Sequence, residues 1–205
     1  MPALSAAAAL FLLGLPAVPQ DTAAFAALAG TVRAPNARTA GAVVYLVPRD
    51  SAAAPLPVDT GLVDQRDLRF VPRTLVVLPG TTVEFRNSDP ILHNVFSPPG
   101  VAEGFDLGIY PRTERRLHTF TAPGAHVILC HVHPEMVAYI VVVPTPWYAV
   151  VDDEGRFRIT GVPPGRYRLR VWHRRAAPFE QSVDIERGER HVEIELLSAA
   201  RRRAR

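Results

Sequence analysis

Apolar and charged residues alternate one for one along much of this chain. Single glutamates separate the apolar residues of 192–196, and single arginines separate those of 166–171. A period of two places each set of side chains on one face of a strand, whereas a helix needs a period near 3.6. Arginines on one strand and glutamates on another also predict cross-strand pairs on a solvated face.

Turn residues interrupt the alternating segments at short intervals. The 205 residues include twenty prolines and thirteen glycines, and no long stretch shows a helical period. Apolar runs at 126–130 and 137–143 have the length of buried strands. We therefore predict an all-β fold of two β-sandwiches.

The charge of the chain does not indicate a nucleic-acid surface. All basic residues are arginines, and net charge is +3. Four arginines lie in the last five residues, so the rest of the chain carries a slight negative charge. Nucleic-acid binding would need basic and aromatic residues clustered on one surface, so we expect no nucleic-acid partner. We expect 199–205 to be an Arg-rich disordered tail, with weak binding to an anionic surface as the alternative.

An apolar run from Ala6 to Leu15 lies near the N-terminus. It is too short to cross a bilayer and fits the apolar region of a secretory signal peptide, although no Lys or Arg precedes it. We predict that residues 1–29 are a signal peptide, with a disordered N-terminal arm as the alternative. Cleavage would fall at the A-L-A sequence at 27–29 or nearer Ala17. The protein would then be periplasmic or secreted, and no other stretch could span a membrane.

The only cysteine of the chain, Cys130, begins a C-x-x-H-x-x-M spacing with His133 and Met136. This segment lies between two predicted strands, so a tight loop would hold all three side chains around one point. His93 follows a turn after another strand and can supply a fourth ligand from a neighbouring loop. Each residue also has an ordinary structural interpretation: a buried cysteine, a hydrogen-bonded histidine or a packed methionine.

A thiolate, two imidazoles and a weak thioether are the ligand set of a trigonal copper site for electron transfer. The thiolate favours Cu(I) and imidazole serves Cu(II). A site that compromises between them changes little when an electron is gained or lost. Zinc also binds cysteine and histidine, but a thioether ligand is unusual for it. The combination therefore favours one copper ion that cycles between Cu(I) and Cu(II).

The stretch from Val63 to Val143 resembles the cupredoxins, a family of blue copper proteins, and among them the amicyanins. Amicyanins show C-x-P-H-P-x-M before a strand of valines, and this chain shows C-H-V-H-P-E-M over 130–136 before its own valines. The family's upstream H-N-V also occurs here, at 93–95. The resemblance implies a cupredoxin domain over residues 62–144.

The same resemblance implies a type 1 copper site with four ligands. These would be His93, Cys130, His133 and Met136. Asn94 would tie the ligand loops together by hydrogen bonds, as in cupredoxins generally. His131 directly follows Cys130, so on an extended backbone its side chain should point away from the metal.

The segments on either side resemble a carboxypeptidase regulatory-like domain. Four short motifs are similar to its strands and turns: G-T-V at 30–32, G-A-V-V-Y-L at 41–46, D-D-E-G at 152–155 and G-V-P-P-G at 161–165. Neither segment has enough strands to bury a core alone. We therefore predict one sandwich, residues 30–50 plus 145–198, that is split by the cupredoxin. The two resemblances together imply a Greek-key cupredoxin sandwich that is inserted in, or packed beside, a small sandwich of transthyretin or immunoglobulin type. This domain type implies a structural or interaction role, and we expect no metal-binding role for His173 or His191.

An exported cupredoxin would exchange electrons with a redox partner, such as a c-type cytochrome or a dehydrogenase, through the exposed edge of His133. The possible docking patch around that edge has six members: Val95, Phe96, Pro98, Pro99, Pro134 and Glu135. Weak redox encounters need only a small interface. Glu135 stands where amicyanins have an aromatic residue, so their partner does not transfer to this chain.

Two other functions use the same features. The ligands would equally serve a copper carrier or sensor, and the smaller sandwich could belong to a surface interaction protein with an accessory cupredoxin. An enzyme is disfavoured, because multicopper oxidases and nitrite reductases place a histidine directly before the ligand cysteine, where this chain has Leu129. A binuclear copper site would need a second cysteine.

Overall fold

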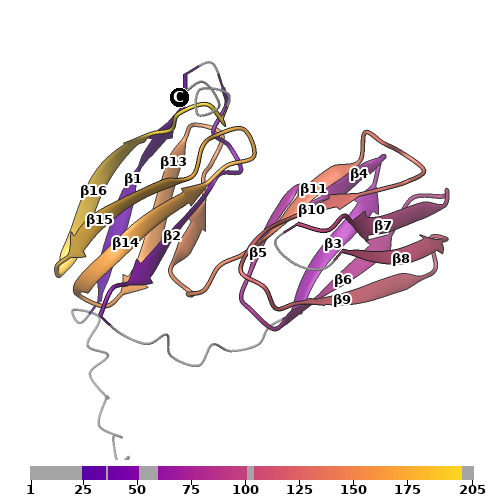
Figure 1. Cartoon of the computed structure of the whole chain (residues 1–205), viewed down its shortest axis with the longest axis horizontal. Helices are drawn as coiled ribbons and strands as arrows, with labels where there is room; N and C mark the ends of the chain where they lie inside the picture. The colour runs from indigo at the N-terminus through magenta and orange to yellow at the C-terminus, as the bar shows by residue number, and fades with distance from the viewer. Residues whose placement is uncertain (1–24, 36, 51–59, 101–103, 200–205) are drawn as a thin grey trace, which may run out of the picture.

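The computed structural model describes residues 25–35, 37–50, 60–100 and 104–199. All sixteen elements named within them are strands, so the all-β prediction is confirmed. The strands form four sheets that pack in pairs, and the two resulting sandwiches lie side by side (Figure 1). This described part holds no helix long and apolar enough to cross a membrane. The first 24 residues of the predicted leader and the tail at 200–205 lie outside the described residues.

The first sandwich takes its strands from both ends of the described chain. One sheet has the order β13-β1-β16 and the other the order β12-β2-β14-β15. The strands are β1 (Ala26–Arg33), β2 (Val43–Pro48), β12 (Tyr148–Val150), β13 (Arg156–Val162), β14 (Gly165–Trp172), β15 (Phe179–Ile185) and β16 (Gly188–Glu195). Inward side chains of both sheets, among them Leu28, Leu46, Ile159 and Leu169, form one apolar core.

The predicted boundary between leader and sandwich at residue 29 is wrong. β1 begins at Ala26 and pairs with β13 on one side and β16 on the other. Leu28 is fully buried and Ala29 nearly so. Cleavage after Ala29 would remove half of β1, so that site is incompatible with the sheet. Small apolar residues resemble a cleavage site in sequence, but here they belong to the central strand of a sheet.

The second sandwich is built from one continuous stretch of chain. Its sheets have the orders β5-β11-β10-β7-β8 and β4-β3-β6-β9. The strands are β3 (Thr60–Arg66), β4 (Arg69–Val71), β5 (Thr74–Val77), β6 (Thr81–Asn87), β7 (His93–Ser97), β8 (Phe105–Tyr110), β9 (Arg115–Phe120), β10 (Gly124–Leu129) and β11 (Val137–Val142). Its core includes Phe85, Tyr110, Phe120 and Ile140.

The two sandwiches meet through a small apolar cluster. Val43 of the first and Val76, Val141 and Val143 of the second are all buried there. β2 leads into β3, and β11 leads back to β12, so the second sandwich interrupts the first in sequence. β11 ends at this junction, and its other end carries the candidate site.

Candidate metal centre

Three neighbouring strands of the five-stranded sheet, β11, β10 and β7, bring the predicted ligands together at one end of the sheet. Leu129, the last residue of β10, pairs with the first residue of β11 and also with β7. Cys130 therefore leaves β10 at the point where β11 begins, and Met136 directly precedes β11. His93 is the first residue of β7. Antiparallel pairing on both sides of β10 thus gathers residues that lie far apart in the sequence.

Ligand atoms of His93, Cys130 and His133 all lie within 4.8 Å of one another. The two histidine Nδ1 atoms are 3.0 Å apart, and the Cys130 Sγ is 4.0 Å from the Nδ1 of His133. Nitrogen and sulfur atoms that share one metal at about 2.0–2.3 Å are separated by about 3–4 Å, so this spacing suits a common ion. His93 and Cys130 are buried, whereas His133 is only half-buried.

A carboxylate lies behind the buried histidine. The Oδ2 of Asp89 is 2.9 Å from the Nε2 of His93. Burial opposes ionisation of Asp89, but hydrogen bonds from the Leu68 N–H, His93 and the Asp67 N–H outweigh it and lower the pKa of Asp89. The ionised carboxylate accepts the Nε2–H of His93. The Nδ1 of His93 is then left with a lone pair on the side of Cys130 and His133.

Two loops hold Asp89 in place. Asp67 and Leu68 form the turn between β3 and β4, and their left-handed backbone (φ 53° and 57°) aims both N–H groups at the Asp89 carboxylate. The Oδ1 of Asn87 accepts the Asp89 N–H at 3.0 Å, and its Nδ2 donates to the Ile91 carbonyl at 2.9 Å. The sequence analysis missed Asp89. The available signal was a carboxylate four residues before a predicted ligand.

Asn94 connects three parts of the site. Its Nδ2 donates to the Oδ1 of Asp106 at 2.7 Å and to the carbonyl of Gly108 at 3.1 Å. Its Oδ1 accepts the backbone N–H of His131 at 3.3 Å, and its own backbone N–H points at the Cys130 Sγ at 3.4 Å. The side chain therefore links β7 to β8 and to the Cys130 loop, and the backbone N–H of Asn94 is aimed at the Cys130 sulfur.

Met136 closes the loop that begins at Cys130. Its backbone N–H donates to the carbonyl of His133 at 3.0 Å, which makes a turn directly before β11. The residue is 1% exposed and belongs to the same apolar core as Cys130. It therefore lies on the buried side of the loop, and its role as a ligand stays a prediction.

His131 is exposed and interacts with residues outside the ligand cluster. Its ring stacks on Phe96, with ring centroids 3.6 Å apart and planes inclined by 6°. Its Nε2 lies 3.4 Å from the Oδ2 of Asp106. A hydrogen bond from the Gly108 N–H, assisted by Asn94 and His131, lowers the pKa of Asp106, so this carboxylate is ionised beside the ring.

One member of the predicted docking patch is wrong. Val95 is fully buried in the core of the second sandwich, whereas Phe96, the next residue of β7, is only half-buried. Phe96 is half-buried under His131, and Pro98, Pro99, Pro134 and Glu135 are exposed. Two apolar side chains that the sequence analysis did not select are also exposed, namely Leu92 at 53% and Val132 at 44%. Each is a sequence neighbour of the ligand loops.

No protein-family model and no curated protein matches the chain. Among solved structures it is similar to a Cu(I) amicyanin variant, with 26% identity and a TM-score of 0.39 over 41% of this chain and 82% of that one. It is similar to a purple cupredoxin from Nitrosopumilus maritimus (22%, 0.37, covering 40% and 99%). It is also similar to a copper-containing nitrite reductase from Thermus scotoductus (31%, 0.38, covering 48% and 25%).

The donor set itself limits the chemistry of the site. One thiolate and two imidazoles suit copper or zinc, whereas magnesium and calcium prefer oxygen ligands. The cluster of His93, Cys130 and His133 is therefore a candidate soft-metal site. The buried carboxylate of Asp89 is directed at His93 and not at the gap between the ligand atoms.

Proposed function

We propose that this protein is a type 1 copper protein of the cupredoxin kind that carries single electrons. Its ligands would be His93, Cys130, His133 and Met136. The observation that carries the proposal is the convergence of two imidazole nitrogens and one thiol sulfur within 4.8 Å at three adjacent strand ends. This is the ligand set of copper electron-transfer sites, once a weak axial thioether is added.

The surrounding chain holds the candidate ligands in fixed positions and shields them from water. His93, Cys130 and Met136 are at most 3% exposed, so water is excluded from one side of the ligand cluster. Asp89 fixes the ring of His93, and Asn94 fixes the Cys130 loop. A bound copper ion would supply the Cu(I)/Cu(II) couple. Ligands held this firmly would change their positions little between the two oxidation states, which lowers the barrier to electron transfer.

The half-buried His133 is the proposed exit for the electron. Exposed apolar side chains lie beside it in sequence, including Val132 and Pro134, and Leu92 directly precedes the other histidine ligand. We propose that a redox partner, such as a c-type cytochrome or a dehydrogenase, docks there through a small interface. We further propose that the protein is exported and does not itself catalyse a reaction. Glu135, which is exposed in the same loop, would influence the choice of partner.

Addition of Cu(II) to the copper-free protein tests the proposal. We expect an intense visible band from thiolate-to-copper charge transfer. The Cys130→Ser variant should lose the band, whereas His131→Gln should keep it, because the His131 ring contacts Phe96 and Asp106 instead of the ligand atoms. A colourless, ordinary Cu(II) complex of the unmodified protein would contradict the type 1 site.

The fourth ligand needs its own measurement. Met136→Leu keeps an apolar side chain of similar size in the core but removes the thioether. We expect the charge-transfer band to remain and the reduction potential to change, because the axial ligand tunes the potential of such sites. An unchanged potential and spectrum would show that Met136 only packs.

A carrier or sensor of copper would instead release the ion to a chelator quickly and show no reversible one-electron wave.

A further inference from the structure

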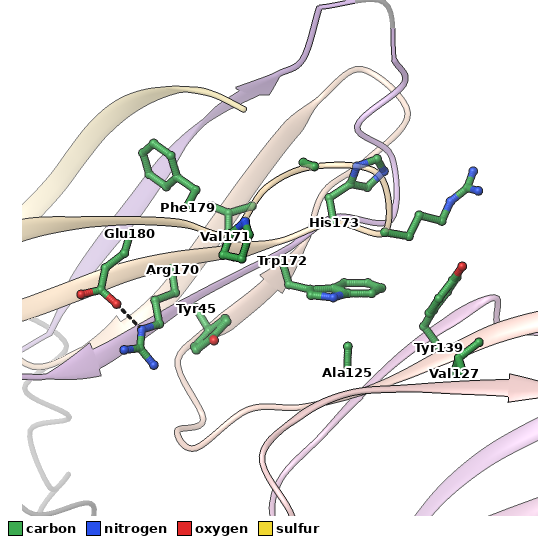
Figure 2. A pocket seen from close by; sticks show the side chains of 13 residues that line it. Tyr45, Ala125, Val127, Tyr139, Arg170, Val171, Trp172, His173, Phe179 and Glu180 are labelled. Carbon is green, nitrogen blue, oxygen red and sulfur yellow. Dashed lines mark hydrogen bonds and ion pairs between the residues drawn. The ribbon is translucent and has the colours of Figure 1, made fainter. Parts of the chain in front are cut away.

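A cleft of about 670 Å³ opens between the two sandwiches, beside the apolar cluster that joins them. Its lining residues come from β2, β14, β15 and the segment 173–178 on one side and from β10 and β11 on the other (Figure 2). The volume lies within the range of about 300–1,000 Å³ that is typical of small-molecule sites. The candidate metal site is formed by other residues, His93, Cys130 and His133, and none of them lines the cleft.

Flat aromatic side chains dominate the walls. Tyr45, Trp172 and Phe179 belong to the first sandwich and Tyr139 to the second, and all four are half-buried. The rings of Tyr139 and Trp172 meet across the junction with centroids 5.2 Å apart. Ala125 and Val127 leave a shallow floor opposite the Trp172 indole (Figure 2). Such walls favour a planar apolar ligand, because aromatic rings stack well on one another.

The cleft carries an uncompensated positive charge. At one end Arg170 is neutralised by Glu180, with 2.6 Å between the Nε and Oε2 atoms. Arg174 takes part in no ion pair of the described residues, and it forms a side-chain hydrogen bond with Tyr139. Burial and the charges of Arg73 and Arg175 lower the pKa of Arg174, so cations crowd this end. Asp153 lines the adjoining hollow but forms no ion pair with Arg174 among the described residues. An anionic group would relieve that repulsion.

We propose that this cleft binds a small aromatic carboxylate. Its ring would lie against Trp172 and Tyr139, and its carboxylate would pair with Arg174. These two features, an aromatic wall and a cation without an ion pair, occur together at this cleft. The inference does not depend on the proposed metal site.

Calorimetric titration of the full chain with 2-naphthoate tests this proposal, and 2-naphthylmethanol serves as the neutral compound of the same shape. We expect saturable binding of the carboxylate to one site and binding of the alcohol at least about tenfold weaker, as expected for loss of a charged hydrogen bond. Absence of saturable binding by 2-naphthoate overturns the proposal. Equal binding of the two compounds overturns the carboxylate specificity.

Two arginine variants locate the site. Arg174→Gln should weaken binding of 2-naphthoate about tenfold, whereas Arg175→Gln, an identical change at an exposed neighbour that does not line the cleft, should leave it within about twofold. Trp172→Ala should also weaken binding by removing a wall. Thermal unfolding of each variant checks that the fold is intact. If both arginine variants weaken binding equally, the compound binds through general charge and the site is excluded.

Discussion

The Nε2 of His93 lies 2.9 Å from the Oδ2 of Asp89, so a fully buried imidazole is held by a carboxylate on the side opposite Cys130 and His133. We expect Asp89→Ala to weaken Cu(II) binding by about 10–100-fold, the usual effect of losing such a partner of a ligand histidine. The physical reason is that His93 loses the group that fixes its tautomer and its orientation. Competition with a chelator of known affinity measures the change.

A remote aspartate provides the control for this prediction. Asp153 is exposed in the first sandwich, so Asp153→Ala removes the same side chain without touching the site. Its copper affinity should equal that of the unmodified protein. If Asp89→Ala binds copper as tightly as Asp153→Ala does, Asp89 has no part in orienting His93.

Asn94→Ala should destabilise the copper-free protein by about 1–3 kcal/mol. The substitution leaves the Gly108 carbonyl and the His131 N–H without their partner, and both bonds are partly buried. Urea unfolding of the copper-free protein measures this cost without any contribution from the metal. Asn94→Asp should be no better tolerated, because it places a second carboxylate beside Asp106. The Nδ2 of Asn94 is 2.7 Å from the Oδ1 of Asp106, so the two carboxylates would repel each other. A variant as stable as the parent would contradict this network.

Gly155→Ala should destabilise the first sandwich and leave the copper spectrum unchanged. Gly155 has a φ of +83°, and a Cβ there would lie 2.8 Å from the backbone oxygen of Val32. Gly161 is the matched control, since it has a φ of +68° but open space around the position of a Cβ. We expect about 1–2 kcal/mol for Gly161→Ala from backbone strain alone and a larger loss for Gly155→Ala. Equal losses in thermal or urea unfolding would show that the contact with Val32 relaxes freely.

Removal of the second sandwich should leave a folded β domain. β2 and β12 are antiparallel neighbours in which Tyr45 pairs with Tyr148, so the end of β2 lies close to the start of β12 and the two strands can be joined by a hairpin loop. We expect a variant that lacks residues 60–144 and carries Val43→Thr, which makes the newly exposed surface less apolar, to show a strand-rich circular dichroism spectrum and cooperative unfolding. The deletion variant should be made with two linkers of different length, because a junction damaged by one linker can be intact with the other. If the variant is unfolded with both linkers, the split sandwich is contradicted.

Local sequence patterns predicted the strands and the candidate ligands, but they did not predict Asp89, the carboxylate that contacts His93. The C-x-x-H-x-x-M spacing between two apolar runs was sufficient to bring Cys130 and His133 together, because the loop is short and both flanking strands are fixed. Asp89 could not be assigned in this way. Its position depends on the turn of Asp67 and Leu68, which the fold alone brings beside it.

The errors of the sequence analysis also have physical causes. Small apolar residues at 26–29 fit a cleavage site and an interior strand equally well, and only the pairing of β1 with two neighbours distinguishes them. Val95 lies between half-buried and buried residues of β7, and the alternation of its strand could not be phased until the core was known. The pairing of β1 with its neighbours and the packing of the core therefore settled two points that the local sequence could not: where the first sandwich begins and which side of β7 is buried.

The pairing of β1 with β16 affects the order in which the polypeptide can assemble. Ala26 pairs in register with Gly188, so the first sheet is not complete until nearly the entire chain has been synthesised. The second sandwich, by contrast, is complete once β11 has emerged. A nascent chain can therefore finish its second sandwich first, while β1 and β2 wait with their apolar faces uncovered. Long-range closure of this kind is slow, which makes those two early strands the segments most in need of a chaperone during biogenesis.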